Sequence, residues 1–189
     1  MYKGLYDQFA HWFHEGKGTV YFYSDPHFAD EEMKHLRAGY IGDEEQVKRI
    51  NSKIGKYDTL VVLGDIGDVE WVKKLRGYKV LIMGNHDAGA SKYTSYFDEV
   101  YEGALIVSEK IILSHEPVDF SYALNIHGHD HSKWSKSDVM HWNVCAEHID
   151  YTPVPLKRII ESGALKVIPT IHRETIDEAT ARKRKREAK

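Results

Sequence analysis

Five short apolar runs, each followed at once by polar residues, constrain the fold of this chain more than any other feature. The runs are residues 19–24, 59–64, 79–84, 110–115 and 124–129. They are rich in β-branched and aromatic residues, and apolar runs of this length and composition are typical of buried strands. The sequence therefore predicts a domain built around a sheet core.

The first helix is predicted between the first two runs. Asp43 can cap a helix over residues 44–56. In this segment three apolar residues share one face at helical spacing, namely Val47, Ile50 and Ile54. Such an amphipathic segment is expected to cover one side of a sheet.

A second helix is expected over residues 69–75, with Asp68 as its cap. Strands that alternate with helices indicate an α/β domain. Residues 104–109 run closely into 110–115, which predicts an adjacent strand pair and a partly antiparallel or mixed sheet. The order of the strands does not follow from these patterns.

Composition places the chain among ordinary globular proteins. With 189 residues, 42% of them hydrophobic and 29% charged, one domain is expected. The net charge of −3 offers no general attraction to nucleic acids. A single cysteine, Cys145, excludes an internal disulfide and a thiolate cluster, so a metal would have to use nitrogen and oxygen ligands. Residues 1–15 contain neither a signal-peptide core nor a membrane span, so a cytoplasmic location is expected.

Side chains that can bind metal ions follow all five runs. They are Asp25, His27, Asp65, Asn85, His115, His129 and His131. In α/β sheets, ligand groups gather at the carboxyl ends of strands, so these side chains should converge. Seven donors exceed the needs of one ion, whereas two divalent cations about 3.5–4 Å apart, bridged by an aspartate, would use them. Imidazole with carboxylate suits manganese, iron, zinc, cobalt or nickel better than calcium, and manganese is favoured here.

Taken singly, each of these motifs has an ordinary explanation. A polar turn after a strand needs no metal, and residues 126–131 (IHGHDH) could form a solvated turn. His127 is expected to be a strand residue that packs or bonds to the backbone. The occurrence of all the motifs in order, each at the end of a strand-like run, favours one shared metal site.

The same motifs resemble those of the calcineurin-like metallophosphoesterase superfamily, in particular its small phage and bacterial members. They are D-x-H at 25–27, G-D at 64–65, G-N-H-D at 84–87, His115, and G-H-x-H at 128–131, and the similarity extends over residues 18–165. The resemblance implies a four-layer α-β-β-α sandwich, two mixed sheets flanked by helices.

Particular roles also follow from the resemblance. It assigns Asp25, His27 and His131 to one metal ion, and Asn85, His115 and His129 to the other. Asp65 would bridge the two ions. His86 would face the substrate phosphate and help to protonate the leaving oxygen, while Asp87 orients its ring. Arg37, in an insertion that resembles one in phage-type members, is the candidate for a phosphate contact.

The function that the resemblance implies is hydrolysis of a phosphomonoester or phosphodiester by a metal-bound hydroxide. A phosphorylated small molecule or a nucleotide is the expected substrate, and nucleic acid is possible. Two alternatives stay open: a nuclease or 2',3'-cyclic nucleotide phosphodiesterase of the same class, and a non-catalytic metal-binding scaffold. No membrane partner is expected, and the oligomeric state is not predicted.

The end of the chain differs from the rest in composition. Residues 1–172 are expected to form the single metallophosphoesterase domain, and residues 173–189 a polar tail with a basic block at 182–186. The tail lacks a sustained apolar stripe, so it is expected to be a frayed helix or disordered. A solvated tail is the simpler interpretation of the basic block than a nucleic-acid arm.

Overall fold

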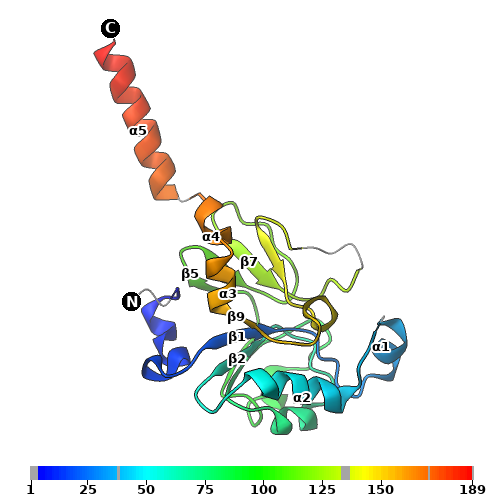
Figure 1. Cartoon of the computed structure of the whole chain (residues 1–189). Coiled ribbons are helices and arrows are strands. Elements are labelled where there is room, and N and C mark those ends of the chain that lie inside the picture. Colours follow the sequence, from blue (N-terminus) through cyan, green and yellow to red (C-terminus); the bar gives the residue numbers. More distant parts are fainter. Residues whose placement is uncertain (1–3, 38, 133–136, 170, 189) are drawn as a thin grey trace.

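Two mixed β-sheets form the centre of the molecule (Figure 1). The computed structural model describes residues 4–37, 39–132, 137–169 and 171–188. The five-stranded sheet has the order β4-β3-β2-β1-β9 and the four-stranded sheet the order β5-β6-β7-β8. The strands are β1 Val20–Tyr23, β2 Thr59–Val62, β3 Tyr78–Ile82, β4 Glu99–Tyr101, β5 Leu105–Ser108, β6 Ile111–Leu113, β7 Leu124–His127, β8 His141–Asn143 and β9 Val154–Pro155.

The directions of the strands place the carboxyl ends of several strands at the same edge of each sheet. β1 to β4 are parallel, and β9 joins β1 antiparallel. In the second sheet β6, β7 and β8 are parallel, and the predicted neighbour β5 pairs with β6 antiparallel. The carboxyl ends of β1, β2 and β3 therefore lie on one edge of their sheet, and those of β6 and β7 on one edge of theirs.

Helices accompany both sheets. The α-helices are α1 Glu31–Leu36, α2 Asp43–Lys53, α3 Leu156–Glu161, α4 Ala164–Val167 and α5 Ile171–Glu187. The 3₁₀ helices are η1 Asp7–Gly16, η2 Val69–Lys74, η3 Ala90–Lys92 and η4 Ala146–Ile149. Within the part of the chain that is described, no helix is both long and apolar enough to cross a membrane.

Alternation along the strands divides the core in two. Phe22 and Val61 join a buried cluster shared by the two sheets, to which α3 adds Ile159. Their neighbours on the opposite face, such as Leu60, pack with α2 and η2 in a second buried cluster through residues that include Ile50. The chain thus has two mixed sheets flanked by helices, which is the architecture predicted from the sequence. This arrangement buries both faces of the central strands, because each face packs against apolar side chains.

Local details differ from the predictions around α2. Asp43 does not cap this helix, because Gly42 holds the cap position and Asp43 is already the first helical residue. Its carboxylate instead accepts hydrogen bonds from the backbone N–H of Ala29 and the hydroxyl of Tyr40. The helix also ends earlier than expected, with Ile54 in an extended conformation. The prediction of a capping aspartate is therefore wrong at this position.

Other short elements agree with their expected roles or could not be expected. Asp68 caps η2 by accepting a hydrogen bond from Glu70 N, as predicted, although the helix is 3₁₀ rather than α. His127 bonds to the backbone, with Nδ1 2.8 Å from Gly128 O. β4, β8 and β9 have only 3, 3 and 2 residues. Strands this short are below the length at which an alternating pattern can be recognised.

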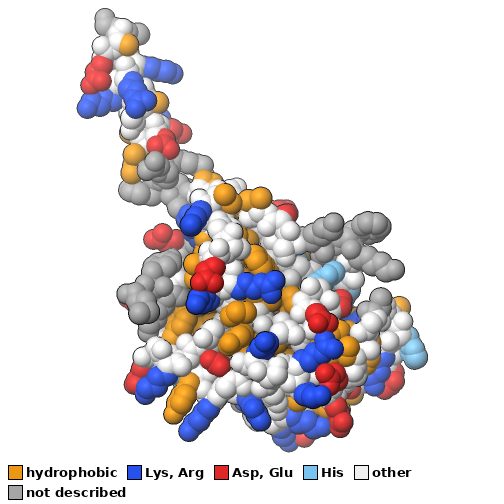
Figure 2. All heavy atoms as spheres, viewed as in Figure 1, with side chains coloured by type: hydrophobic (Ala, Val, Ile, Leu, Met, Phe, Trp, Pro, Cys, Tyr) orange, Lys and Arg blue, Asp and Glu red, His pale blue; other side chains and the backbone are white. Residues whose placement is uncertain are grey.

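The tail forms α5, which extends away from the body of the molecule (Figure 1). Lys and Arg side chains surround the outer end of this helix (Figure 2). Ion pairs one turn apart, such as Arg182–Glu178 at 3.2 Å, support it only weakly. Of the two expected states of the tail, the structure shows the helical one.

A buried carboxylate ties η1 to the five-stranded sheet. Glu99 Oε1 lies 2.6 Å from His11 Nε2 and accepts hydrogen bonds from Trp12 Nε1 and Tyr78 OH, at 2.8 and 2.9 Å. Tyr101 OH donates to the other oxygen at 2.5 Å. Burial raises the pKa of Glu99, but these hydrogen bonds outweigh burial and lower it.

We expect Glu99→Ala to lower the free energy of unfolding by about 2 kcal/mol, because it leaves the fully buried indole N–H of Trp12 without an acceptor. Since the folded-state pKa of Glu99 lies below its unfolded value, the wild type should lose part of this stability as the pH falls below about 4. Urea unfolding at pH 7 and at about pH 3 measures both effects. The exposed Glu109→Ala is the control, and equal losses for the two variants would contradict the prediction.

Candidate metal centre

The predicted donors come together where the two sheets meet at their carboxyl ends. Asp25 and His27 follow β1, Asp65 follows β2, and Asn85 follows β3. His115, His129 and His131 follow β6 and β7 in the second sheet. The two sheets are joined here by a hydrogen bond from His129 N to Asp25 Oδ2 at 2.9 Å.

Three of the donors form a first candidate metal position, called the first metal position below. His131 Nε2 lies 3.3 Å from Asp25 Oδ1, and His27 Nε2 lies 3.9 Å from the same oxygen. These residues offer ligand atoms that all lie within 4.8 Å of one another. Asp25 Oδ1 and His27 Nε2 are buried and have no hydrogen-bond partner among the described residues. Two buried orphan acceptors that face each other fit a cation between them.

Three further donors form a second candidate metal position, called the second metal position below. Asn85 Oδ1 lies 2.8 Å from His115 Nε2 and 3.1 Å from His129 Nδ1. The two histidine nitrogens are 3.1 Å apart. Two imidazole nitrogens and an amide oxygen this close together could ligate one cation, because unprotonated imidazole nitrogens and amide oxygens are metal-ligand atoms.

Asp65 lies between the two positions. Its Oδ2 is 3.5 Å from His27 Nε2 in the first position and 3.5 Å from His115 Nε2 in the second. Its other oxygen accepts a hydrogen bond from His86 N at 3.0 Å. One carboxylate oxygen is therefore used by the loop, and the other points between the two groups of donors, as a bridging ligand requires.

Backbone conformation helps to aim these side chains. Asp25, His27, Asp65 and His129 all have positive φ, at 55°, 43°, 54° and 65°. A non-glycine residue in this region is uncommon and carries strain, which neighbouring structure must hold in place. The occurrence of four such residues among seven proposed ligands marks the loops as shaped for a site.

Three glycines leave room for the donors. A Cβ on Gly84 would lie 2.2 Å from Asp65 Oδ1, and one on Gly64 would lie 2.6 Å from His115 Nδ1. A Cβ on Gly128 would lie 2.2 Å from Asp25 Oδ2. The glycines of the G-D, G-N-H-D and G-H-x-H motifs are thus required by close packing against the carboxylates and imidazoles.

Hydrogen bonds on the far side of the rings set which nitrogen faces the site. His115 Nδ1 lies 2.8 Å from Leu63 O, and His131 Nδ1 lies 2.5 Å from Glu147 Oε1. These oxygens only accept, so both rings carry a proton on Nδ1, and in the neutral ring Nε2 is the free ligand atom. Both rings therefore present to the proposed metal positions the nitrogen that a cation needs.

Charges in the site shift its pKa values. Burial raises the pKa of Asp25, but His131 and His115 outweigh burial and hold it well below its usual range. Burial lowers the pKa of His131, but the carboxylates of Asp25 and Glu147 outweigh burial and raise it to about 9. His27 has a lowered pKa because of burial and the nearby Arg37. Without a cation, the ring of His131 is therefore protonated on both nitrogens at pH 7. A cation that binds Nε2 would displace the proton from that nitrogen.

The structure corrects the role expected for Asp87. Its carboxylate accepts hydrogen bonds from the backbone N–H groups of Gly84, Asp65 and Ile66, at 2.8, 3.0 and 3.0 Å, and from the hydroxyl of Tyr93 at 3.1 Å. No contact joins it to the ring of His86 in the described chain. Asp87 thus holds the two loops that carry Asp65 and Asn85, because backbone donors occupy both of its oxygens.

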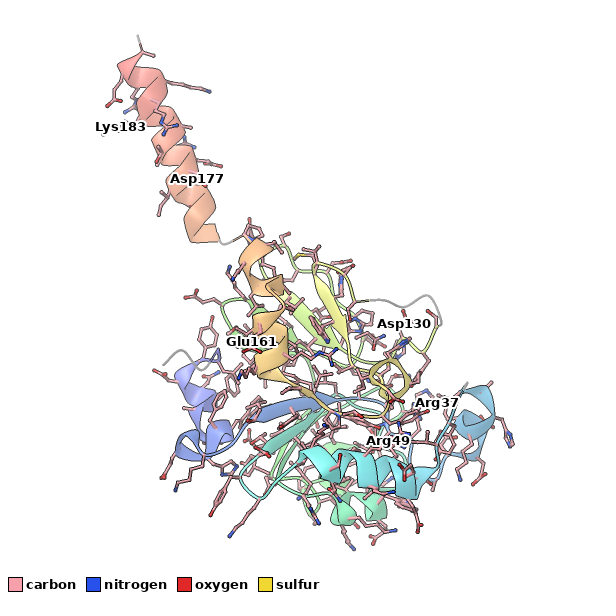
Figure 3. The ribbon with its side chains drawn as sticks, viewed as in Figure 1. Arg37, Arg49, Asp130, Glu161, Asp177 and Lys183 are labelled. Atoms are coloured by element: carbon pink, nitrogen blue, oxygen red, sulfur yellow. The ribbon has the colours of Figure 1, made fainter. Side chains whose placement is uncertain are left out.

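Arg37 also differs from its expected position. Its side chain is only 1% exposed and faces Glu147, with Nε 3.8 Å from Glu147 Oε2. Nη2 donates to the backbone oxygen of Asp25 at 2.5 Å. Figure 3 labels Arg37 at the junction of α1 with the body of the domain. A buried guanidinium that is used in this way does not suit the expected phosphate contact, which requires an exposed side chain.

Two residues near the site were not anticipated as site residues. Glu147 contacts His131, and Cys145 Sγ donates to Asp25 Oδ2 at 3.2 Å. Both lie in the segment after β8, whose sequence carries no metal-binding spacing. Only the position of this segment beside β1, through a bridge between Ser24 and Cys145, brings them to the site.

A cavity of about 320 Å³ opens beside the second metal position. Asn85 and His115 form part of its wall. Glu102 and Glu116 also line it, and the described lining residues include no Lys or Arg. The cavity is large enough for a small organic group and is acidic in character.

Comparison with solved structures shows that the fold of this chain is similar to that of a known protein. No family model matches the chain, and no curated protein matches it. Among solved structures, the protein AQ665 of unknown function from Aquifex aeolicus is 26% identical over 76% of this chain and 98% of its own, with a TM-score of 0.64. Pseudomonas putida nuclease MPE is 24% identical, with a TM-score of 0.43 over 58% of this chain and 60% of its own. Yfce, a phosphoesterase from E. coli, is 17% identical, with a TM-score of 0.40 over 67% and 78%. The chain therefore shares its fold with the Aquifex aeolicus protein, and its function has to be argued from its own residues.

Proposed function

We propose that this protein is a phosphoesterase that depends on two divalent metal ions. The observation that supports this proposal most is the position of Asp65 Oδ2, 3.5 Å from a histidine of each metal position. The orphaned acceptors of Asp25 and His27 add to it. The five motifs, which resemble those of calcineurin-like metallophosphoesterases, point to the same chemistry.

When bound, the two cations would supply Lewis acidity and lower the pKa of a coordinated water toward neutrality. The protein's own part is positional. Asp65 would hold the ions at a fixed separation, and Asp87 would fix the loops that carry Asp65 and Asn85 through its backbone hydrogen bonds. No side chain is required as a covalent nucleophile.

His86 is the proposed proton donor. The residue is exposed, and its ring lies 5.8 Å from that of His27 in the first metal position. Its backbone is fixed by the hydrogen bond to Asp65, while the ring is free to meet a substrate from the solvent side. A leaving oxygen above the metal pair would be within reach of this imidazole.

The cavity beside the second position suggests how a substrate lies. Glu102 and Glu116 disfavour a second phosphate there, so a neutral or cationic group of the substrate is expected to occupy it. Small phosphomonoesters or terminal phosphodiesters suit this arrangement better than the middle of a nucleic-acid strand.

The first test is metal-dependent hydrolysis by the purified protein. With manganese we expect turnover of p-nitrophenyl phosphate or bis-p-nitrophenyl phosphate, and a panel with 2',3'-cyclic nucleotides and labelled single-stranded and duplex nucleic acids separates the substrate classes. Metal analysis of the same sample gives the ions bound. Bound metal without hydrolysis of any of these substrates would refute the enzyme and leave a metal-binding scaffold.

His86→Ala is expected to lower kcat about 10²-fold on phenyl phosphate and much less on p-nitrophenyl phosphate. The nitrophenolate is stable without a proton, whereas the phenolate leaves poorly unless its oxygen is protonated. Steady-state kinetics on both esters with manganese measure the difference. His35→Ala, an exposed histidine on α1, should leave both rates unchanged. An equal loss on the two esters would rule out the proton-donor role.

A further inference from the structure

We propose that Glu147, held in place by Arg37, positions His131 and sets the affinity of the first metal position. This inference rests on the proposed metal centre and assigns the two residues a role within it. It depends on a buried chain of contacts that runs from Arg37 through Glu147 to the ring of His131.

The contacts close into a ring around the first metal position. Arg37 donates to the backbone oxygen of Asp25 at 2.5 Å and lies 3.8 Å from Glu147. Glu147 holds His131 Nδ1 at 2.5 Å, and His131 Nε2 returns to Asp25 Oδ1 at 3.3 Å. Arg37 and Glu147 thus each contact a proposed ligand of the same metal position, namely Asp25 and His131.

Glu147 distinguishes His131 from the other proposed histidine ligands. His27 Nδ1 lies 3.3 Å from Asp30 Oδ2, which is a longer and weaker contact. His115 bonds to a neutral carbonyl, Leu63 O. A short bond to a carboxylate makes an imidazole a stronger ligand and fixes its orientation. His131 is therefore the histidine whose ligand strength depends most on one side chain.

Arg37 explains how Glu147 can stay charged in this place. The side chain of Glu147 is 14% exposed and that of Arg37 is 1% exposed. A carboxylate so far from water needs a partner charge, and Arg37 supplies it from α1. None of the residues of α1 is buried, and its two flanking residues contact the site: Asp30 contacts His27, and Arg37 contacts Asp25 and Glu147.

The chain of contacts could instead serve only stability, and the two roles predict different results. If the role is structural, removing both charges together restores the protein, because a buried pair can be replaced by neutral groups at little cost. If Glu147 acts on the metal, the same double replacement restores folding without restoring metal affinity.

The experiment compares four proteins freed of metal: the wild type, Glu147→Gln, the double variant Arg37→Met with Glu147→Gln, and Glu45→Gln. Glu45 lies on the exposed side of α2 with Lys48 and Arg49 and serves as the matched control. Titration calorimetry with Mn²⁺ measures affinity at each position, and thermal unfolding without metal measures stability.

We expect one of the two Mn²⁺ binding events to weaken about 10- to 100-fold in Glu147→Gln, with the other event unchanged. The double variant should regain the metal-free unfolding temperature of the wild type while the weak event stays weak. Glu45→Gln should match the wild type in both measurements.

Two outcomes would overturn the inference: wild-type affinity at both positions in Glu147→Gln, or recovery of affinity in the double variant. Failure of the proposed function is distinct from these, because in that case the wild type itself would bind no Mn²⁺ or would not hydrolyse phosphoesters.

Discussion

Asp65→Asn is expected to lower phosphoesterase activity about 10³-fold or more, the largest effect of any single substitution in the site. Asp65 Oδ1 accepts the backbone N–H of His86, and the asparagine oxygen can take over this bond. The amide nitrogen then replaces Oδ2, which lies between the two metal positions. The amide thus places N–H donors where two cations are expected, which opposes their binding. Loss of a Lewis acid costs several kcal/mol of transition-state stabilisation. Each 1.4 kcal/mol lowers the rate about tenfold.

Kinetics with manganese and metal analysis of the same sample measure this effect. Asp68→Asn is a matched control three residues along the same loop, since asparagine also caps helices well and Asp68 only caps η2. Activity within about tenfold of the wild type for Asp65→Asn, with two metal ions still bound, would contradict the bridging role.

The site could be anticipated from sequence because its donors follow strands. The apolar runs that end at residues 24, 64, 84, 115 and 129 are read from composition alone, and parallel strands carry whatever follows them to a common edge. The structure brings Asp25 and His131 within 3.3 Å although 105 residues lie between them along the chain. Local pattern and sheet topology are sufficient for this part of the prediction.

The errors concern side chains whose role depends on a partner that the sequence does not name. Asp87 was expected at the ring of His86, but backbone N–H groups of two loops take up its carboxylate. Arg37 was expected over the site, but Glu147 and the backbone of Asp25 draw it beneath the site. A long side chain at the end of a helix can reach either place, and only the packed structure decides between them.

Glu147 was missed for a related reason. It lies in the first turn of η4, after the short strand β8, and its segment lacks the histidine or aspartate spacing that marks the other ligands. Its proximity to His131 arises because the segment after β8 crosses to β1 through the bridge between Ser24 and Cys145. Contacts that hold ligands from behind are set by such crossings and leave no periodic signal in the sequence.

The glycine before His129 makes a second large effect predictable. A Cβ at position 128 would lie 1.9 Å from Ser24 Oγ, 2.6 Å from Ser24 Cβ and 2.2 Å from Asp25 Oδ2. Ser24 and Asp25 are both fully buried, and Ser24 Oγ is fixed by its hydrogen bond to Leu63 O at 2.6 Å. Neither side chain can turn away into solvent, so an added methyl group must move the ligand or the strand.

Gly128→Ala is therefore expected to displace Asp25, to weaken Mn²⁺ binding at the first position at least about 100-fold, and to lower the free energy of unfolding by about 1–3 kcal/mol through overpacking. Calorimetric titration and urea unfolding of the metal-free protein measure the two losses separately. Gly89→Ala is the control, because a Cβ there meets nothing within 4 Å and its backbone angles suit alanine. If Gly128→Ala bound two Mn²⁺ ions as tightly as Gly89→Ala, Asp25 would not be a metal ligand, since a carboxylate whose Oδ2 lies 2.2 Å from the new methyl carbon could not keep its place.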